Sequence, residues 1–273
     1  MFIGAHIPRK TTIIKTLEDI KINGGNALQL FTTNPRSLKI TDNSKYLNEA
    51  HLIKKYCKIN KFAVIVHSPY AFNISKPFLS GKKELEIKDT LVYNDITTAN
   101  YIGANGYVIH VGKSTTSPIK EALLMMKNNI KNIIQEMMKN NIKTKLLLET
   151  PAGQGTELLK DFKEFINFYY SFDETERSYF KLCIDTCHIW NAGYELNEII
   201  SLIPNKNDIL CIHLNNSKNI KGAKLDRHEY LFEGKINPLE LKKFIYEFEN
   251  SIIILEMPSI EYNKELLFLT NNE

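Results

Sequence analysis

The sequence has few cysteines, and they form no recognisable motif. They show no CxxC spacing and no regular framework, and a chain of 273 residues is too large to depend on disulfide bonds. The N-terminus lacks a charged leader with an apolar stretch behind it, and no run reaches the roughly 18 apolar residues of a membrane span. The sequence therefore predicts a soluble intracellular protein, cytoplasmic or nuclear according to its source, with no secretion signal and no membrane partner. The cysteines are Cys57, Cys183, Cys187 and Cys211.

Arginine is also scarce, so lysine carries most of the positive charge. Lys and Arg total 35 against 31 Asp and Glu, which gives a formal net charge of +4 and a pI near 8.6. This balance permits a polyanionic substrate but falls short of the strongly basic range of a dedicated nucleic-acid module. No linker rich in Gly, Pro or Ser divides the chain, so we expect one domain over residues 1–273.

Short apolar runs alternate with longer amphipathic segments from one end of the chain to the other. This order is typical of a parallel sheet whose strands are covered on both faces. Eight strand–helix units close most simply into a single α/β domain, a TIM (β/α)8 barrel, and an open doubly wound sheet is the alternative. The expected strands are 2–7, 27–33, 62–68, 106–112, 145–151, 180–188, 208–217 and 251–258, and the clearest helices are 12–23, 85–102, 118–140 and 238–249.

Residues that can bind metals gather at the expected strand ends. In a TIM barrel the C-terminal ends of the strands meet at the active-site face. A single histidine at a strand end is usually an ordinary polar group, and only the whole set supports a metal site. Imidazole mixed with carboxylate suits zinc, with manganese or iron as second choices, and nine donors are too many for one tetrahedral ion. The set is His67, His110, Glu149, Asp185, His188, His213 and Glu256, with Asp226 and His228 in the long connection 218–237.

Clustered metal ions are typical of phosphodiester hydrolysis. The motifs of this chain resemble those of the endonuclease IV family of apurinic/apyrimidinic endonucleases, which adopt a TIM barrel with three zinc ions. They run in the family's order over nearly the full length, and CIDTCH and DRH are the most specific. The matching segments are GAH (4–6), QLFTTNPR (29–36), HSPY (67–70), IHVG (109–112), ETPAGQG (149–155), CIDTCH (183–188), HLNNSK (213–218), DRH (226–228), EGKI (233–236) and LE (255–256).

The resemblance implies a role for each residue of the set. His67, His110 and Glu149 would hold one zinc. Glu149 would bridge to a second zinc held also by Asp185, His213 and Glu256, and His188, Asp226 and His228 would hold the third. Glu149 and Glu256 would be the catalytic carboxylates. The expected reaction is hydrolysis 5′ to abasic sites in double-stranded DNA, giving a 3′ hydroxyl and a 5′ deoxyribose phosphate, with removal of blocked 3′ ends as a further activity. The family also implies a monomer without an obligate protein partner.

Two positions resemble DNA-contact residues of the family. Arg36 would enter the DNA near the abasic gap and Tyr70 would intercalate, because opening the stack costs least where a base is missing. The alternatives are a solvated arginine and a rim tyrosine. We expect His6 to lie behind the metal ligands or in the substrate pocket. Cys187, read as part of an extended segment, is expected to pack in the core.

Three positions depart from the family's usual residues: Asn216 stands for an acidic residue, Glu229 for a histidine and Phe232 for a glycine. Asn216 would weaken the support of a metal ligand, and Phe232 would alter a loop near the mouth. Two other functions remain open from the sequence. A sugar isomerase on a related barrel also uses His and carboxylate ligands, and an inactive homologue would bind damaged DNA without cutting it.

Overall fold

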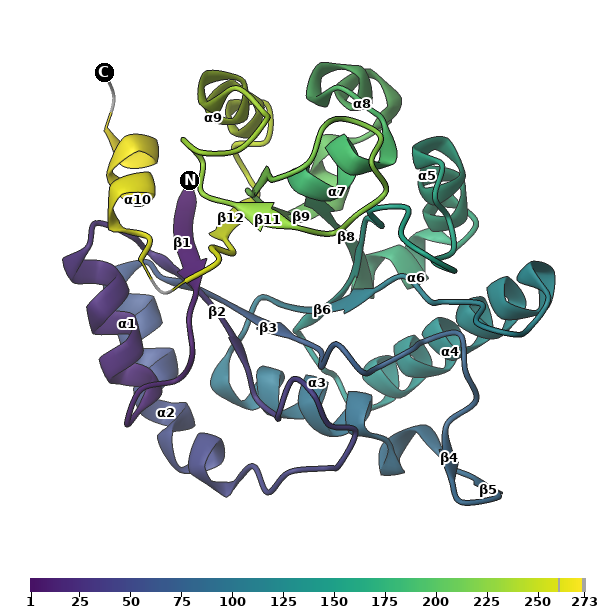
Figure 1. The fold of residues 1–273 in the computed structure, drawn as a ribbon. Coiled ribbons are helices and arrows are strands. Elements are labelled where there is room, and N and C mark those ends of the chain that lie inside the picture. The colour runs from purple at the N-terminus through teal and green to yellow at the C-terminus, as the bar shows by residue number, and fades with distance from the viewer. Residues whose placement is uncertain (260, 272–273) are drawn as a thin grey trace.

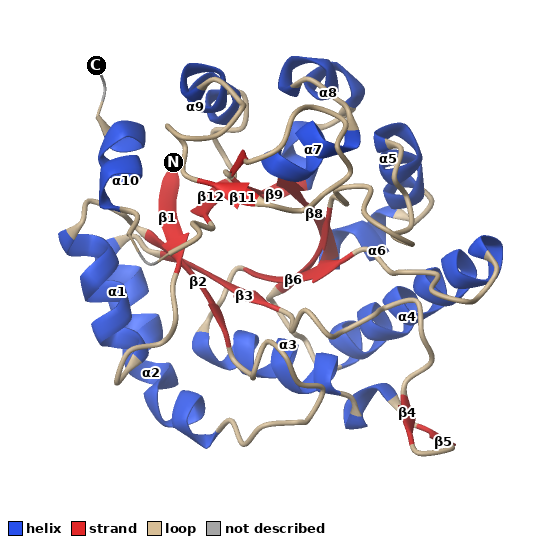
Figure 2. Ribbon diagram, viewed as in Figure 1, coloured by secondary structure: helices blue, strands red, loops and turns tan. Residues whose placement is uncertain are grey.

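The computed structural model describes residues 1–259 and 261–271, and its central feature is a closed barrel of eight parallel strands surrounded by helices (Figure 1, Figure 2). The TIM-barrel prediction is confirmed, and the open-sheet alternative is wrong. Around the barrel the strands follow one another in chain order, and the last pairs with the first. They are β1 (Phe2–His6), β2 (Ala27–Phe31), β3 (Ala63–His67), β6 (Gly106–His110), β7 (Lys145–Glu149), β8 (Phe180–Asp185), β9 (Ile209–His213) and β12 (Ile252–Leu255).

Each barrel strand lies inside an expected run and is shorter than it. The alternation of side chains divides the core into two layers. In β3, Val64 and Val66 face outward and pack against the helices, whereas Ala63 and Ile65 face the barrel axis. Both layers are apolar, which explains why the runs read as continuously hydrophobic.

Helices cover the outside of the barrel, and most begin at a side-chain cap. Thr12 caps α1 and Asn237 caps α9, whose first residue is Pro238. The helices are α1 (Ile13–Ile22), α2 (Ser44–Asn60), α3 (Leu91–Ile102), α4 (Ile119–Lys139), α5 (Phe162–Tyr170), α6 (Glu174–Tyr179), α7 (Thr186–Ala192), α8 (Leu196–Leu202), α9 (Pro238–Tyr246) and α10 (Asn263–Thr270), with 3₁₀ turns at Ile87–Asp89 and Lys206–Asp208.

Two expected segments are interrupted. The helix expected over 85–102 is divided, because the Thr90 hydroxyl accepts from the Tyr93 amide and starts α3 only at Leu91. The strand expected over 180–188 ends at Asp185, whose carboxylate caps α7 by accepting from the backbone N–H of His188. A residue that caps a helix cannot continue the strand, so the chain turns from β8 directly into α7.

The connections at the C-terminal ends of the strands form the mouth of the barrel. The segment after β9 crosses this mouth and includes a small antiparallel pair, β10 (Asn216–Ser217) with β11 (His228–Glu229). A second hairpin, β4 (Leu79–Ser80) with β5 (Lys83–Glu84), projects from the connection after β3. Among the described residues, no helix has the length and apolar character needed to cross a membrane.

Candidate active site

The site residues continue the inward face of the barrel toward its mouth. Because inward positions recur every second residue, the apolar floor residue Ile65 is followed by His67. The same step leads from Leu147 to Glu149 and from Cys211 to His213. The last inward position of each of these strands is polar and those below it are apolar, so the strands deliver their polar ends to one place.

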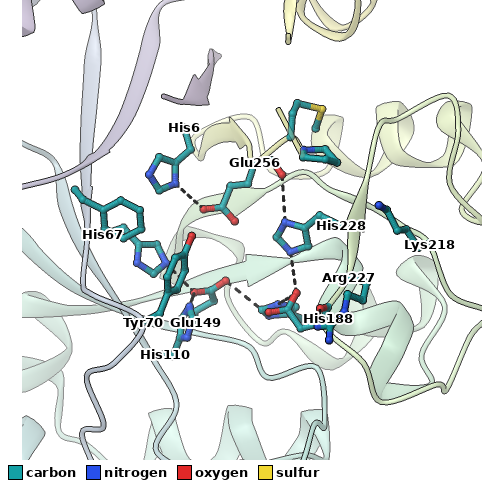
Figure 3. A pocket seen from close by; sticks show the side chains of 14 residues that line it. His6, His67, Tyr70, His110, Glu149, His188, Lys218, Arg227, His228 and Glu256 are labelled. Carbon is teal, nitrogen blue, oxygen red and sulfur yellow. Dashed lines mark hydrogen bonds and ion pairs between the residues drawn. The ribbon is translucent and has the colours of Figure 1, made fainter. Parts of the chain in front are cut away.

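Seven of the nine expected donors line a cavity of about 400 Å³ at the mouth (Figure 3). The other two, Asp185 and His213, are completely buried beside it. Figure 3 shows imidazoles and carboxylates pointing toward one another from strands that are far apart in sequence. One wall is less polar and includes Phe31 and Met257. The residues that line it are His6, Phe31, His67, Tyr70, His110, Glu149, His188, Lys218, Asp226, Arg227, His228, Glu256, Met257 and Pro258.

The first group of donors is His67, His110 and Glu149, from three adjacent strands. The Nε2 atom of His67 lies 3.3 Å from Oε2 of Glu149, and that of His110 lies 3.0 Å from the same oxygen. His67 and Glu149 are almost completely buried, whereas His110 is partly exposed to the cavity.

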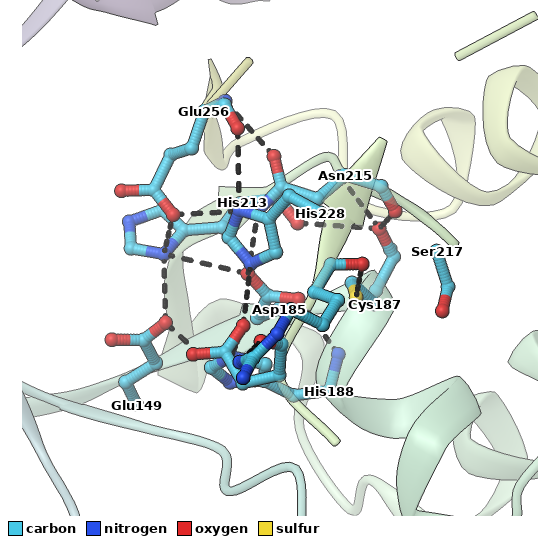
Figure 4. A network of polar contacts seen from close by, with 12 residues as sticks. Glu149, Asp185, Cys187, His188, His213, Asn215, Ser217, His228 and Glu256 are labelled. Atoms are coloured by element: carbon cyan, nitrogen blue, oxygen red, sulfur yellow. Dashed lines mark hydrogen bonds and ion pairs between the residues drawn. The ribbon is translucent and has the colours of Figure 1, made fainter. Parts of the chain in front are cut away.

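The second group surrounds His213 (Figure 4). Its Nδ1 atom lies 2.9 Å from Oε1 of Glu149, 3.3 Å from Oε2 of Glu256 and 3.9 Å from Oδ2 of Asp185. Glu149 therefore offers one oxygen to the first group and the other to the second.

The third group joins α7 to the segment that crosses the mouth. The Nε2 atoms of His188 and His228 lie 3.3 Å and 3.2 Å from the same atom, Oδ1 of Asp226. Within residues 1–259 and 261–271, both nitrogens are buried without a partner in hydrogen-bonding geometry. Buried polar atoms of this kind require a partner.

The other ring nitrogens of these histidines are held by the main chain. The Nδ1–H of His67 donates to the carbonyl of Ser68 at 2.7 Å, and that of His188 donates to the carbonyl of Thr150 at 2.7 Å. His228 contacts the carbonyl of Glu256 in the same way at 3.2 Å. A carbonyl can only accept, so in each neutral ring Nε2 presents a lone pair to the cavity, as metal-binding imidazoles do.

Both the donors and their spacing fit zinc. A zinc ion about 2.0–2.1 Å from each of two tetrahedral ligands would hold those atoms roughly 3.3 Å apart. The closest contacts in the three groups, from 2.9 to 3.3 Å, lie near this value. The two orphaned nitrogens of His188 and His228 are the clearest sign that a cation belongs here.

The electrostatics of the protein alone also call for a cation. Burial lowers the pKa of His188, but Asp185 and Asp226 outweigh burial and hold that pKa well above its usual range. The pKa of His228 rises to about 9, because the same two carboxylates overcome its burial. In Glu149, burial raises the pKa, yet His110 and His213 bring it well below its usual range. The carboxylates thus draw positive charge into the cavity, and a divalent ion would supply it.

Three residues that sequence reasoning missed or left open hold Glu256 and its neighbours. Gln29 donates to Oε1 of Glu256 at 2.6 Å and accepts from Nε2 of His213 at 2.9 Å. Asn215 contacts Asp185 at 2.6 Å and Glu256 at 3.3 Å, and Nδ1 of His6 lies 3.0 Å from Glu256. The signal for Gln29 was a buried amide at an inward position of an apolar strand, and Asn215 follows His213 by one inward step.

Of the two residues expected to contact DNA, Tyr70 lines the cavity and Arg36 lies on a neighbouring loop. Tyr70 is 58% exposed, and its ring lies edge-on to that of Phe31, with 5.2 Å between centroids. Arg36 is exposed and does not line the cavity. The backbone N–H of Tyr70 donates to the carbonyl of Pro35 at 2.9 Å, which joins the two loops.

Several expectations about neighbouring residues need correction. Cys187 is buried as expected, but it belongs to α7 and not to an extended segment. Asn216 touches none of the nine donors: its side chain bonds the backbone of Leu231 and Ile236, and so holds the segment that crosses the mouth. Phe232 does not line the cavity and packs against Phe268 of α10.

The barrel and its polar mouth define a broad class before they define a family. Residues 17–271 match the family described as xylose isomerase-like TIM barrel. A D-tagatose 3-epimerase-like protein has the same fold, with a TM-score of 0.70, 17% identity and coverage of 99% of this chain and 97% of that one. At this identity the likeness shows the fold alone.

Within that class, sequence identity is decisive. The chain is 32% identical over 267 residues to the probable endonuclease 4 of Metamycoplasma arthritidis, covering 94% of this chain and 92% of that protein. Endonuclease IV from Thermus thermophilus superposes with a TM-score of 0.75 at 21% identity, covering 99% of this chain and 97% of that one. This chain belongs to the endonuclease IV family, as its motifs predicted, and is an enzyme of the metal-dependent nuclease type.

Proposed function

We propose that this enzyme hydrolyses the phosphodiester bond 5′ to abasic sites in double-stranded DNA, leaving a 3′ hydroxyl and a 5′ deoxyribose phosphate. The observation that carries the proposal is the clustering of three donor groups at and directly beneath one cavity, with Glu149 shared by two of them. Cleavage of a phosphodiester requires stabilisation of the attacking and leaving oxygens together, for which adjacent cations are suited.

Three zinc ions account for the donors. His67, His110 and Glu149 would hold the first ion, Glu149, Asp185, His213 and Glu256 the second, and His188, Asp226 and His228 the third. When bound, the ions polarise the phosphoryl oxygens and stabilise the leaving oxyanion. Manganese or iron would suit the same mixed donors as second choices.

Glu149 and Glu256 are the carboxylates that we assign to catalysis, and Glu256 is the one suited to orient the attacking water. Gln29 and His6 fix its Oε1 atom, so the carboxylate has one orientation in the cavity. Burial raises its pKa, but His213 and His6 bring the pKa below its usual range. A carboxylate that stays ionised in one orientation accepts a hydrogen bond from the attacking water and orients it for the reaction. Glu149, between two donor groups, keeps those groups at a fixed separation.

Recognition of the abasic site is assigned to the rim. Tyr70 lines the cavity and is largely exposed, and Arg36 lies on the loop bonded to it. A nucleotide without a base leaves the stack at the lowest cost, and an aromatic wedge beside a pocket selects for it. Lys218 lines the cavity and supplies positive charge for a phosphate.

The sugar-isomerase alternative shares the fold but explains less of the site. Such enzymes need fewer metal ligands than the nine donors here, and they have no use for an exposed arginine and tyrosine on joined loops. Turnover of a free sugar by the metal-loaded protein would favour it. We also propose that the enzyme removes blocking groups from 3′ ends, since this reaction and cleavage at abasic sites both hydrolyse a phosphoester. The proposed enzyme would act as a monomer.

The test uses a duplex oligonucleotide with one abasic-site analogue. Strand scission and zinc content are measured for the purified protein, for the metal-stripped protein and after zinc is returned. We expect cleavage 5′ to the analogue that disappears with the metal and returns with zinc. An intact strand in the presence of a fully zinc-loaded protein would refute the proposal.

A pair of histidine variants separates the site from general effects. His228→Ala removes a donor of the third group, and His51→Ala removes an exposed histidine of α2 outside the cavity. We expect H228A to lose about one zinc per chain and most of the activity, whereas H51A keeps both.

A further inference from the structure

A buried carboxylate lies outside the three donor groups, and the proposed chemistry does not use it. Asp95 of α3 is completely buried. Three hydroxyls donate to it: Thr32 to Oδ1 at 3.3 Å, and Thr33 and Tyr107 to Oδ2 at 3.1 and 3.4 Å. Among the described residues no cation pairs with Asp95, so its charge is supported by hydroxyl groups alone.

Two of these hydroxyls belong to the loop that carries Arg36. Thr32 and Thr33 directly follow β2 and begin the connection to α2. Arg36 lies three residues beyond Thr33, and its N–H donates to the side chain of Asn34 at 2.9 Å. The carboxylate therefore holds the base of the loop, while the loop's tip is exposed.

The other end of the loop is held by the same face of α3. Thr98, one turn after Asp95, accepts a hydrogen bond from the side chain of Asn43, the residue before α2. Figure 1 shows the connection from β2 to α2 running past α3. Residues 32–43 are thus attached at both ends to positions 95 and 98, which lie on one face of the helix.

The attachment extends to the second rim residue. Pro35, in the middle of this loop, accepts the backbone N–H of Tyr70. A displacement of the loop would therefore move Arg36 directly and Tyr70 through Pro35.

Burial of the Asp95 carboxylate without a cation costs free energy. Burial raises the pKa of Asp95 to about 7, although the three hydroxyl donors lower it.

We propose that Asp95 is a positioning residue for DNA recognition, which anchors the loop 32–43 to α3 and thereby sets the place of Arg36 and Tyr70 at the mouth. This inference rests on the proposed function, because it assigns DNA contact to those two residues. Asp95 touches neither the cavity nor any of the nine donors. It acts on substrate binding and leaves the chemical step to the metal groups.

The experiment compares the zinc-loaded full-length protein with matched variants. Asp95→Asn keeps the shape but turns one acceptor into a donor that faces a hydroxyl, and Thr33→Val removes one donor from the other side. Thr33→Ser restores the hydroxyl. Asp208→Asn is the control: Asp208 is also buried, and it accepts from Lys181 at 2.6 Å and Tyr170 at 2.8 Å at the start of β9, the end remote from the mouth.

We expect D95N and T33V to raise KM for the abasic duplex about tenfold, the equivalent of one lost hydrogen bond, with kcat and zinc content close to wild type. T33S should behave as wild type, and D208N should leave KM unchanged. The double variant D95N/T33V should be no worse than either single variant, because both break the same contact. An unchanged KM in D95N and T33V, or an equal rise of KM in D208N, would overturn the inference.

Amide hydrogen exchange separates this inference from the proposed function. D95N should speed exchange in residues 32–43 and at Tyr70 but not elsewhere, whereas D208N should not affect this loop. This measurement needs no DNA. A wild-type protein that fails to cut the abasic duplex would refute the proposed function, while unchanged exchange in D95N would refute the anchoring by Asp95.

Discussion

The buried carboxylate of Asp95 makes the stability of the protein depend on pH in a defined direction. Its pKa is about 7 in the folded protein, because burial outweighs the three hydroxyl donors, against 3.8 for an ordinary Asp. Below about pH 4 both folded and unfolded states hold the proton, and the contribution of Asp95 to stability is fully present. As the pH rises toward 7, the unfolded chain releases the proton first, so this contribution is lost.

The size of the effect follows from the two pKa values. Between pH 5 and pH 8 the loss from this one group amounts to about 2–3 kcal/mol. Asp95→Asn removes the titration but keeps the side-chain shape, so D95N should lack this part of the pH dependence. The residues of the three donor groups titrate in both proteins, so their contribution cancels when the unfolding free energy of D95N is subtracted from that of wild type.

Urea unfolding at pH 5, 6.5 and 8 measures the difference, with equal zinc content in both proteins. We expect the free energy of unfolding of wild type to fall relative to D95N as the pH rises, by about 2–3 kcal/mol over the range. Parallel pH profiles for the two proteins would show that Asp95 titrates normally, and the account of its burial would be wrong. D208N provides a second comparison, since burial of Asp208 is outweighed by Lys181 and Tyr170, which hold its pKa below the usual range.

Three further predictions concern the site and its supports. Glu149→Gln should lower the activity by more than the roughly 10–100-fold that follows loss of a group hydrogen-bonded to a metal ligand, because one donor group loses its oxygen to an NH2 group and both lose the negative charge. Zinc analysis and strand scission test this, and a fully active, fully metallated variant would exclude the shared role. Arg36→Ala and Tyr70→Ala should each weaken binding of the abasic duplex about tenfold at constant zinc content, and equilibrium binding that stays at the wild-type level in both would remove them from recognition. Asn216→Asp, which restores the acidic residue usual in the family, should lower the free energy of unfolding by about 3 kcal/mol, because two buried carbonyls lose their donor; an unchanged urea midpoint would contradict this.

The order of apolar runs predicted eight parallel strands and favoured a barrel, and the family motifs favoured it over an open sheet. A strand such as β3 is apolar on both faces and ends in a histidine, and this pattern needs no tertiary information. The ends of the strands and helices were harder to predict from the sequence. Asp185 reads as the end of a strand in the apolar run 180–188, and only the hydrogen bond to the amide of His188 reveals that it also starts α7.

The donor set could be proposed from sequence because strand ends converge, but its supports could not. Gln29 and Asn215 are uncharged and lie beside apolar residues, so their roles depend on which carboxylate faces them across the barrel. Asn216 illustrates the opposite error, since its place in a motif predicted a role beside a ligand while its hydrogen bonds go to the backbone. The link between Asp95 and Thr33 spans 62 positions and leaves no periodic pattern in the chain.

The main-chain carbonyls behind His67, His188 and His228 have a consequence for how this site can change over generations. Every residue type carries a carbonyl, so substitution at positions 68 or 150 alters a side chain without removing the group that aims the imidazole. The orientation of these three rings therefore depends on the course of the backbone and not on the identity of the neighbouring side chains. Residues 68 and 150 can change without loss of these hydrogen bonds as long as the barrel keeps its shape. His213 differs, because the side chain of Gln29 orients it and a substitution at position 29 would remove that hydrogen bond.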